Sequence, residues 1–352
     1  MKLHIFNPEH EISLAYDREY VTMPHLVRQF RHDLAFLPVI WARDGDAILV
    51  DDVPSARRDA EKWLGKKPEV VFMTKDEITV MQLASVAPWG WNRQLRRQLK
   101  DAGMKDHSLP DDTTLRRIRD MANRVQTILL MSQLREGFED ITVGDPIYCG
   151  DFDEVRAMAT INGLSVMKAP WSSSGRGVKY IGTPIDLPLQ RWCRNVIKKQ
   201  GGIIVEPYYN KVKDFAMEFV SNGRGFVRYA GLSLFDTVNG AYQGNILATE
   251  ATKEKMLSRY VDPVILRQLQ YRICSIMAEE LKGIYDGPFG VDMMIVTGKD
   301  GKGFRIDPCV EINLRMTMGH VALHATTQKD DETAVMRVVY DKEKFKLKIN
   351  KL

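Results

Sequence analysis

Short apolar runs alternate with amphipathic segments through the first hundred residues. The apolar runs, each bounded by turn residues, are LHIF at 3–6, FLPVIW at 36–41, ILV at 48–50 and VVFM at 70–73. Segments 21–34 and 54–67 carry apolar residues at helical spacing, and Gly65 is placed to end the second one. Strands that alternate with helices predict a parallel sheet in a three-layer α/β unit. We expect this unit to span residues 1–110.

The pattern changes after residue 110. The acids at 111 and 112 precede a predicted helix whose apolar stripe runs from Leu115 to Leu129. A second helix at 153–163, a strand at 164–170, a polar loop, a strand at 178–181 and a helix ending at Gly201 follow. Short strands joined through loops predict a small α+β unit at 111–205.

The remaining segment, 206–352, predicts a mostly antiparallel sheet. Strands are expected at 202–209, 215–221 and 226–235, and a long helix at 263–282. Two further strands, FGVDMMIV and FRIDPCVEIN, flank the turn GKDGKG and therefore predict a hairpin.

A lysine and a glycine-containing loop form the first candidate site. Lys168 lies near the end of a predicted strand, and SSSGRG follows at 172–177. Glycines allow the backbone to approach anionic oxygens, and successive N–H groups and hydroxyls can surround a phosphate. An ordinary hairpin loop has the same composition, so both interpretations stay open.

The second candidate is the segment IIVEPYY with a later acid. Pro207 removes a backbone donor next to Tyr208, so this strand end cannot continue a full ladder. Free backbone groups there could pair with an adenine edge, and Glu206 and Asp214 could reach its amino group and the ribose. The alternative is an edge strand that ends in a turn.

The third candidate combines Asp292 on one hairpin strand with Glu311 and Asn313 on the other. Residues 311 and 313 share a face because side chains alternate along a strand. Hard oxygen ligands of this kind suit Mg²⁺. Reflection about the turn brings Asp292 close to 310–311, and Pro308 predicts a bulge that sets the register. The alternative is a solvated strand face.

Composition and charge exclude several classes of protein. The 352 residues carry 50 basic and 46 acidic side chains, and a net charge of +4 does not indicate a nucleic-acid binder. Four separated cysteines favour a reducing cytoplasm over a disulfide framework. No apolar run reaches the ~20 residues of a membrane span, and the N-terminus is expected to be a strand and not a signal peptide. P-loop, dinucleotide and HExxH motifs are absent.

Taken together and in order, the three candidates resemble the ATP-grasp superfamily of carboxylate–amine ligases. The segments that carry the resemblance are KAPWSSSGRGV, IIVEPYYNKVKDFAMEF, FGVDMMIV and CVEINLR. The resemblance implies an α/β and α+β fold: a Rossmann-like domain at 1–110, then an ATP-grasp lid at 111–205 and a C-terminal ATP-grasp subdomain at 206–352.

The resemblance also implies roles for the candidate residues. Lys168 would contact phosphate, the loop would close over the triphosphate, and Arg124 stands where the family usually has a second lysine. Glu206, Pro207 and Tyr208 would meet adenine, Asp214 the ribose, and Asp292, Glu311 and Asn313 would hold Mg²⁺. Arg315 is the candidate for stabilising an acyl phosphate. The loop residues in question are Ser172, Ser173, Ser174, Gly175, Arg176 and Gly177.

The implied activity is ATP- and Mg²⁺-dependent ligation of a small-molecule carboxylate to an amine, through an acyl phosphate and with release of ADP. A kinase-like member of the fold and a non-catalytic nucleotide-binding module are the alternatives. We expect a cytoplasmic protein with neither nucleic-acid nor membrane partners, and homo-oligomers stay open. Glu9, His10 and Glu11 follow the first strand, where open α/β sheets bind ligands; a capped loop is the alternative interpretation.

Overall fold

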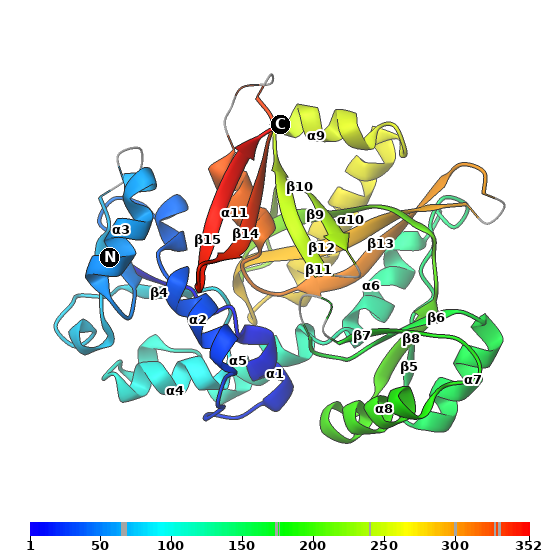
Figure 1. The fold of residues 1–352 in the computed structure, drawn as a ribbon, viewed down its shortest axis with the longest axis horizontal. Coiled ribbons are helices and arrows are strands. Elements are labelled where there is room, and N and C mark those ends of the chain that lie inside the picture. The colour runs from blue at the N-terminus through cyan, green and yellow to red at the C-terminus, as the bar shows by residue number, and fades with distance from the viewer. Residues whose placement is uncertain are drawn as a thin grey trace.

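Three sheets organise the chain in the computed structural model (Figure 1), which describes residues 1–64, 69–172, 175, 177–238, 241–298, 301–326, 329 and 332–352. The strand orders are β3-β2-β1-β4, β5-β8-β6-β7 and β13-β12-β9-β10-β11-β14-β15. The first sheet is parallel and the other two are antiparallel. An α/β unit therefore precedes two α+β units. Within the described ranges, no helix combines the length and apolar character needed to cross a bilayer.

The parallel sheet comprises β1 (Lys2–Ile5), β2 (Ala47–Leu49), β3 (Val71–Met73) and β4 (Ser85–Pro88). Its helices are α1 (His10–Tyr16), α2 (His25–Asp33), α3 (Val53–Leu64) and α4 (Arg93–Asp101). Gly65, the expected end of the second helix, lies outside the described residues. The predicted strand at 36–41 is wrong, because the segment forms a 3-10 helix, Leu37–Ile40. Pro38 suits the first turn of a helix, and the run is apolar because it is buried on all sides.

The predicted helix from residue 111 is two helices, α5 (Asp112–Met121) and α6 (Val125–Arg135). The Asp111 carboxylate caps α5 by accepting from the Thr114 N–H at 2.7 Å. At the break, the Asn123 side chain accepts from the Val125 N–H at 2.9 Å, and the Arg124 N–H donates to the Pro170 carbonyl at 3.1 Å. The break therefore brings Arg124 to the segment that leads into the glycine loop.

The middle sheet comprises β5 (Ile147–Cys149), β6 (Ser165–Lys168), β7 (Val178–Ile181) and β8 (Ile203–Pro207). Helices α7 (Phe152–Asn162) and α8 (Leu187–Gln200) pack on it and share a separate core with it. Strand β8 runs to Pro207, beyond the predicted end of the middle unit at residue 205.

The large sheet comprises β9 (Lys211–Asn222), β10 (Val227–Val238), β11 (Ala241–Leu247), β12 (Asp286–Thr297), β13 (Phe304–Asn313), β14 (Ala334–Asp341) and β15 (Lys344–Lys351). Its helices are α9 (Glu250–Leu257), α10 (Pro263–Glu280) and α11 (Met318–Ala325). The predicted hairpin is confirmed: Asp292 pairs with Glu311, whereas Met294 pairs with Asp307. Two extra residues on β13 make a bulge at 308–310, as Pro308 predicts.

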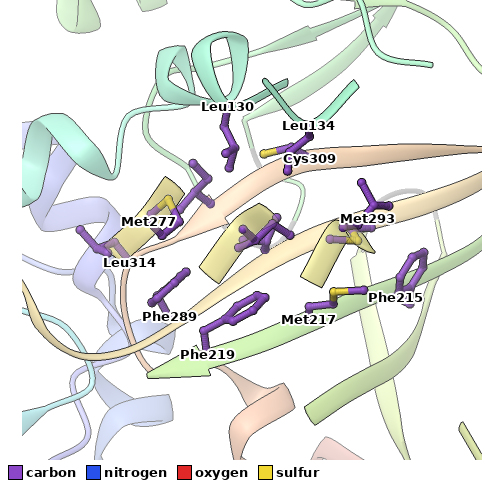
Figure 2. Packing of buried hydrophobic residues seen from close by; sticks show 14 of the residues in the cluster. Leu130, Leu134, Phe215, Met217, Phe219, Met277, Phe289, Met293, Cys309 and Leu314 are labelled. Carbon is purple, nitrogen blue, oxygen red and sulfur yellow. The ribbon is translucent and has the colours of Figure 1, made fainter. Parts of the chain in front are cut away.

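The main core lies between the large sheet and helices α6 and α10. Figure 2 shows Leu130 and Leu134 of α6 and Met277 of α10 facing side chains of β9, β12 and β13. These strand residues are Phe215, Met217, Phe219, Phe289, Met293 and Cys309, all buried. Because α6 packs on β13, the helix that follows Arg124 is fixed against the hairpin that carries the predicted metal ligands.

The last strand joins the large sheet to the N-terminal unit. The Phe345 ring contacts the Phe30 ring of α2 edge to face, with centroids 5.0 Å apart. The Lys344 ammonium pairs with the Asp59 carboxylate of α3 at 2.7 Å. The Phe345 N–H also donates to the Asp33 carboxylate at 2.8 Å. The last strand of the chain is therefore packed against helices α2 and α3 of the N-terminal unit.

Candidate active site

Lys168 ends β6 at the point where the middle sheet meets the β12–β13 hairpin. Its ammonium forms an ion pair with Glu206 on the neighbouring strand β8. The same ammonium donates to the Val310 carbonyl at 3.5 Å, so it reaches the bulge beside Glu311. Both charged side chains are almost fully buried. The predicted phosphate-binding lysine and the predicted metal-binding hairpin thus lie together.

The glycine loop folds tightly beyond Lys168. The Ala169 N–H donates to the Gly177 carbonyl at 2.8 Å, and the Val178 N–H donates to the Gly175 carbonyl at 3.1 Å. Gly175 has a φ of 72°, and a Cβ on Gly177 would lie 2.2 Å from the Ser172 hydroxyl oxygen. Both positions therefore require glycine. Ser173, Ser174 and Arg176 lie outside the described residues.

Arg124 bridges this loop and the hairpin. Its Nη1 donates to the Ala169 carbonyl and to the Ser172 hydroxyl, both at 2.6 Å, and its Nη2 donates to the Ser172 carbonyl at 3.0 Å. The Nη2 group also pairs with the Glu311 carboxylate at 2.7 Å. A planar guanidinium suits such divergent acceptors, whereas a lysine ammonium does not. The side chain is only 4% exposed.

The acids of the hairpin crowd one another. Asp292 lies directly across from Glu311, and Asn313 lies across from Gly290. Burial and the negative charges of Glu311 and Glu218 raise the pKa of Asp292 to about 8, although Asn313 and Arg315 oppose the shift. A divalent cation would relieve this repulsion.

The side chains of Asp292, Glu311 and Asn313 are oxygen donors of the kind that Mg²⁺ prefers. Two carboxylates and an amide oxygen are hard ligands, and Mg²⁺ in such sites is completed by water and substrate phosphates. Within the described ranges, no three or more His, Cys, Asp or Glu side chains are grouped so that they could hold a metal by themselves.

Arg315 connects the hairpin to the N-terminal unit. Its guanidinium forms an ion pair with Glu11 of α1, and its Nη2 donates to the Asn313 side-chain oxygen at 2.8 Å. A further N–H donates to the Met316 carbonyl at 3.1 Å. Burial alone would lower the pKa of Arg315. The negative charges of nearby carboxylates, of which Glu11 has the largest effect, outweigh burial and raise this pKa. The same arginine and burial lower the pKa of His10 to about 3.

The predicted adenine and ribose residues lie on β8, just after it, and on β9. The Tyr208 N–H, expected to be free, donates to the Leu164 carbonyl at 3.0 Å. The Tyr208 ring is 41% exposed and contacts the Tyr180 ring with centroids 5.9 Å apart. The Asp214 carboxylate pairs with Lys211 and accepts from the Thr237 hydroxyl, both at 2.6 Å. Asp214 lies on β9 of the large sheet, whereas Glu206 lies on β8 of the middle sheet.

Sequence reasoning missed a buried group beside the acids. Glu218 of β9 pairs with His320 of α11 at 3.0 Å and accepts from the Thr317 hydroxyl at 2.8 Å. Asp307 is also buried, and burial together with the charge of Glu206 raises its pKa to about 7. The available signal was a lone acid inside an apolar strand, as in FAMEF and FRIDP.

Comparison with known proteins gives a fold but no sequence relative. No protein-family model and no curated protein sequence matches the chain. N5-carboxyaminoimidazole synthetase from Staphylococcus aureus superposes with a TM-score of 0.51 and 11% identity, over 97% of this chain and 83% of that one. The biotin carboxylase domain of the 2-oxoglutarate carboxylase from Hydrogenobacter thermophilus, in complex with MgADP, superposes with a TM-score of 0.55 and 11% identity. The match covers 96% of this chain and 74% of that one.

Biotin carboxylase from Campylobacter jejuni gives a TM-score of 0.50 and 11% identity, over 96% of this chain and 75% of that chain. These neighbours are ATP-grasp proteins, and the match extends over the N-terminal unit as well as the two α+β units. The chain therefore has the fold of these ATP-grasp proteins.

Proposed function

We propose that the protein is an ADP-forming ligase that uses ATP and Mg²⁺ to activate a small carboxylate as an acyl phosphate and joins it to an amine. The structural neighbours are ligases of this broad class, and one of them is a complex with MgADP and bicarbonate. The nucleotide and the metal ion are therefore the expected cofactors of this chain too.

The observation that carries the proposal is the meeting of three cations with three acids at one place. Lys168 pairs with Glu206, Arg124 with Glu311, and Arg315 with Glu11. A polyphosphate would give Lys168 and Arg124 new acceptors, and a metal ion would give Glu311 a new partner. Such an exchange would give each of these three buried charges an oppositely charged partner.

In the proposed reaction, an oxygen of the substrate carboxylate attacks the γ-phosphorus of ATP, and the bond to the β,γ-bridging oxygen breaks to release ADP. The amine then attacks the acyl carbon, loses a proton and expels inorganic phosphate. Mg²⁺, when bound, would neutralise charge on the phosphates. Lys168 and Arg124 would orient the triphosphate, Asp292, Glu311 and Asn313 would hold the metal, and Arg315 would stabilise the acyl phosphate. Most of the rate would come from positioning and charge.

Residues of β8, β9 and the glycine loop would set the nucleotide position. Glu206 and Pro207 would face adenine, and Asp214 the ribose, while the Tyr208 N–H stays bound to the Leu164 carbonyl. Ser172, Gly175 and Gly177 would line the triphosphate, together with the loop residues outside the described ranges. We also propose the predicted division of the chain into an N-terminal domain, a lid and a metal-binding subdomain.

The experiment is an ADP-release assay on a library of acid–amine pairs, with hydroxylamine added to trap acyl phosphate. Glu311→Gln removes one charge from the metal site without a change in size, and we expect a loss of about 100-fold or more in kcat. Glu280→Gln, an exposed glutamate at the end of α10, is the matched control and should keep full activity.

Three outcomes would contradict the proposal in different ways. Full activity in Glu311→Gln would remove the metal assignment. Steady ADP release without a trapped hydroxamate would favour a kinase-like reaction that stops at phosphorylation. Mg²⁺-dependent ATP binding without turnover on any pair would favour a nucleotide-binding regulatory module.

A further inference from the structure

A separate cavity of about 340 Å³ lies inside the N-terminal unit. Its lining comes from residues 9–98 only, so it shares no side chain with the candidate active site. Glu9 follows β1, Asp51 follows β2 and Lys75 follows β3, which places the cavity at the carboxyl ends of three parallel strands. Open α/β sheets bind their ligands at this edge. The volume is within the range of small-molecule sites.

The cavity presents two cationic groups that have no protein partner. Arg31 of α2 is already paired with the Glu9 carboxylate at 2.6 Å. Across the described part of the chain, neither the Lys75 ammonium nor the Arg28 guanidinium has a hydrogen bond or an ion pair. Burial, and then the charge of Arg31, lower the pKa of Lys75. An anionic ligand would offset both of these effects.

The cavity also presents an unused acceptor. Glu9 is 5% exposed, and its Oε2 atom is buried without a hydrogen-bond partner among the described residues. A buried carboxylate oxygen without a donor is destabilising, so native structures rarely leave one unpaired. A ligand that brings a donor, above all a charged N–H group, would satisfy this oxygen.

We propose that this cavity binds a small molecule of the amino-acid class. Its carboxylate would bind Lys75 and Arg28, and its ammonium group would donate to Glu9 Oε2, with Asp51 nearby on the same lining. Three cationic and two acidic side chains leave the lining with one net positive charge. An amino acid with an acidic side chain balances that charge, and the apolar residues Val21, Met23 and Val27 would contact its methylene groups.

The inference does not depend on the ligase assignment. The neighbouring residue Glu11 pairs with Arg315 of the candidate active site, while Glu9 faces the cavity, so α1 is the structural connection between the two. Binding can nevertheless be measured without ATP. Glu311→Gln should leave it unchanged, which separates a failure of this inference from a failure of the proposed function.

The test is calorimetry and thermal unfolding of the full chain with L-glutamate and L-aspartate as probes. Glutarate and succinate, which lack the amino group, and inorganic phosphate are the comparison ligands. We expect saturable binding of at least one amino acid, with a rise in Tm of about 2 °C or more at saturation. Removal of the amino group should weaken binding by about tenfold or more.

Two variants locate the binding. Glu9→Gln removes the charged acceptor, and Lys75→Met removes an ammonium that has no hydrogen bond or ion pair among the described residues. Each should weaken binding by about tenfold or more, whereas the exposed Lys282→Met should not. The inference is overturned if neither amino acid binds the wild-type protein, if glutarate or phosphate binds as tightly, or if Lys75→Met, folded by circular dichroism, binds as the wild type does.

Discussion

Arg124 shows how one side chain can hold two parts of a site at once. It donates to the Ala169 carbonyl and to Ser172 in the glycine loop and pairs with Glu311 on the hairpin. A lysine keeps the charge but has one point of contact in place of the planar fork. The geometry therefore explains how an arginine at this position connects the loop and the hairpin.

Arg124→Lys is expected to lower the free energy of unfolding by about 1–3 kcal/mol, because buried carbonyls of the loop lose their donors. It should also raise KM for ATP, because the loop is no longer held near the hairpin. Urea unfolding and ATP titration measure the two effects, with the exposed Arg116→Lys on α5 as the control. Equal stability and equal KM in Arg124→Lys would show that the fork is dispensable.

Asp307 predicts a pH dependence of stability. Its pKa in the folded protein is raised to about 7, by burial first and then by Glu206, while Lys168 opposes the shift. Between its ordinary pKa of 3.8 and about 7 the folded state holds a proton that the unfolded state has lost. Stability therefore falls as the pH rises through this window, by up to about 4 kcal/mol for one group.

Asp307→Asn cannot lose this proton, and its amide oxygen can still accept from the Cys309 N–H. We expect the variant to be more stable than the wild type at pH 8 and to have a smaller advantage at pH 5. Urea unfolding at both values measures the difference, and the exposed Asp140→Asn should change little at either pH. A wild type that is as stable as Asp307→Asn at pH 8 would contradict the raised pKa.

At the scale of elements, α11 packs closely on β9 at a glycine. A Cβ on Gly319 would lie 1.9 Å from the Glu218 carboxylate and 2.6 Å from the Ser233 hydroxyl. Alanine normally stabilises a helix relative to glycine by roughly 0.5–1 kcal/mol. Here alanine should destabilise the protein, because its Cβ would clash with Glu218, and Glu218 is buried and bound by Thr317 and His320.

Gly319→Ala is therefore expected to destabilise the protein by about 1–3 kcal/mol, the usual cost of overpacking. Thermal or urea unfolding checks the change. Gly182→Ala is the matched control, since no heavy atom lies within 4 Å of its added Cβ, and it should be nearly neutral. A neutral Gly319→Ala would mean that Glu218 can move away at no cost.

The sequence predicted those elements whose signals are local. Asp111 caps a helix, the GKDGKG turn joins two strands, and Pro308 marks a bulge; each depends on residues a few positions apart. The break at Arg124 was missed because part of it is a hydrogen bond to Pro170, far along the chain. The 3-10 helix at 37–40 was missed because complete burial removes the alternation that separates helices from strands.

The same limit applies to the candidate site. Lys168, Asp292 and Glu311 stand out because charged residues interrupt apolar strands. Which acid pairs with which base depends on how three sheets meet, and the sequence contains no local record of it. The partnership of Glu218 and His320, 102 positions apart, is of this kind.

At the scale of the whole molecule, the site lies between units and should respond to its cofactors as a whole. We expect MgADP to raise the Tm, with a stabilisation of about 2.7 kcal/mol at a ligand concentration 100 times Kd. EDTA should remove most of the gain, because in the proposed site the acids of the hairpin would reach the nucleotide through the metal. Thermal unfolding with MgADP, with ADP plus EDTA and without ligand makes the comparison.

Asp292→Asn supplies the control for that experiment. It should keep the response to ADP with EDTA and lose the additional response to Mg²⁺. Equal Tm values with and without Mg²⁺ in the wild type would contradict a metal-dependent nucleotide site.

The packing of β15 on α2 and α3 has a mechanical consequence. Phe345 and Lys344 fasten the N-terminal unit to the large sheet, so these two parts form a common frame. The β5–β8 sheet has a core of its own and reaches that frame at the site through two residues, among other contacts. Lys168 donates to the Val310 carbonyl, and Arg124 donates to Ala169 and Ser172 in the glycine loop. A nucleotide that enters or leaves the site would then require those contacts to break, so that the β5–β8 sheet can move relative to the other two parts.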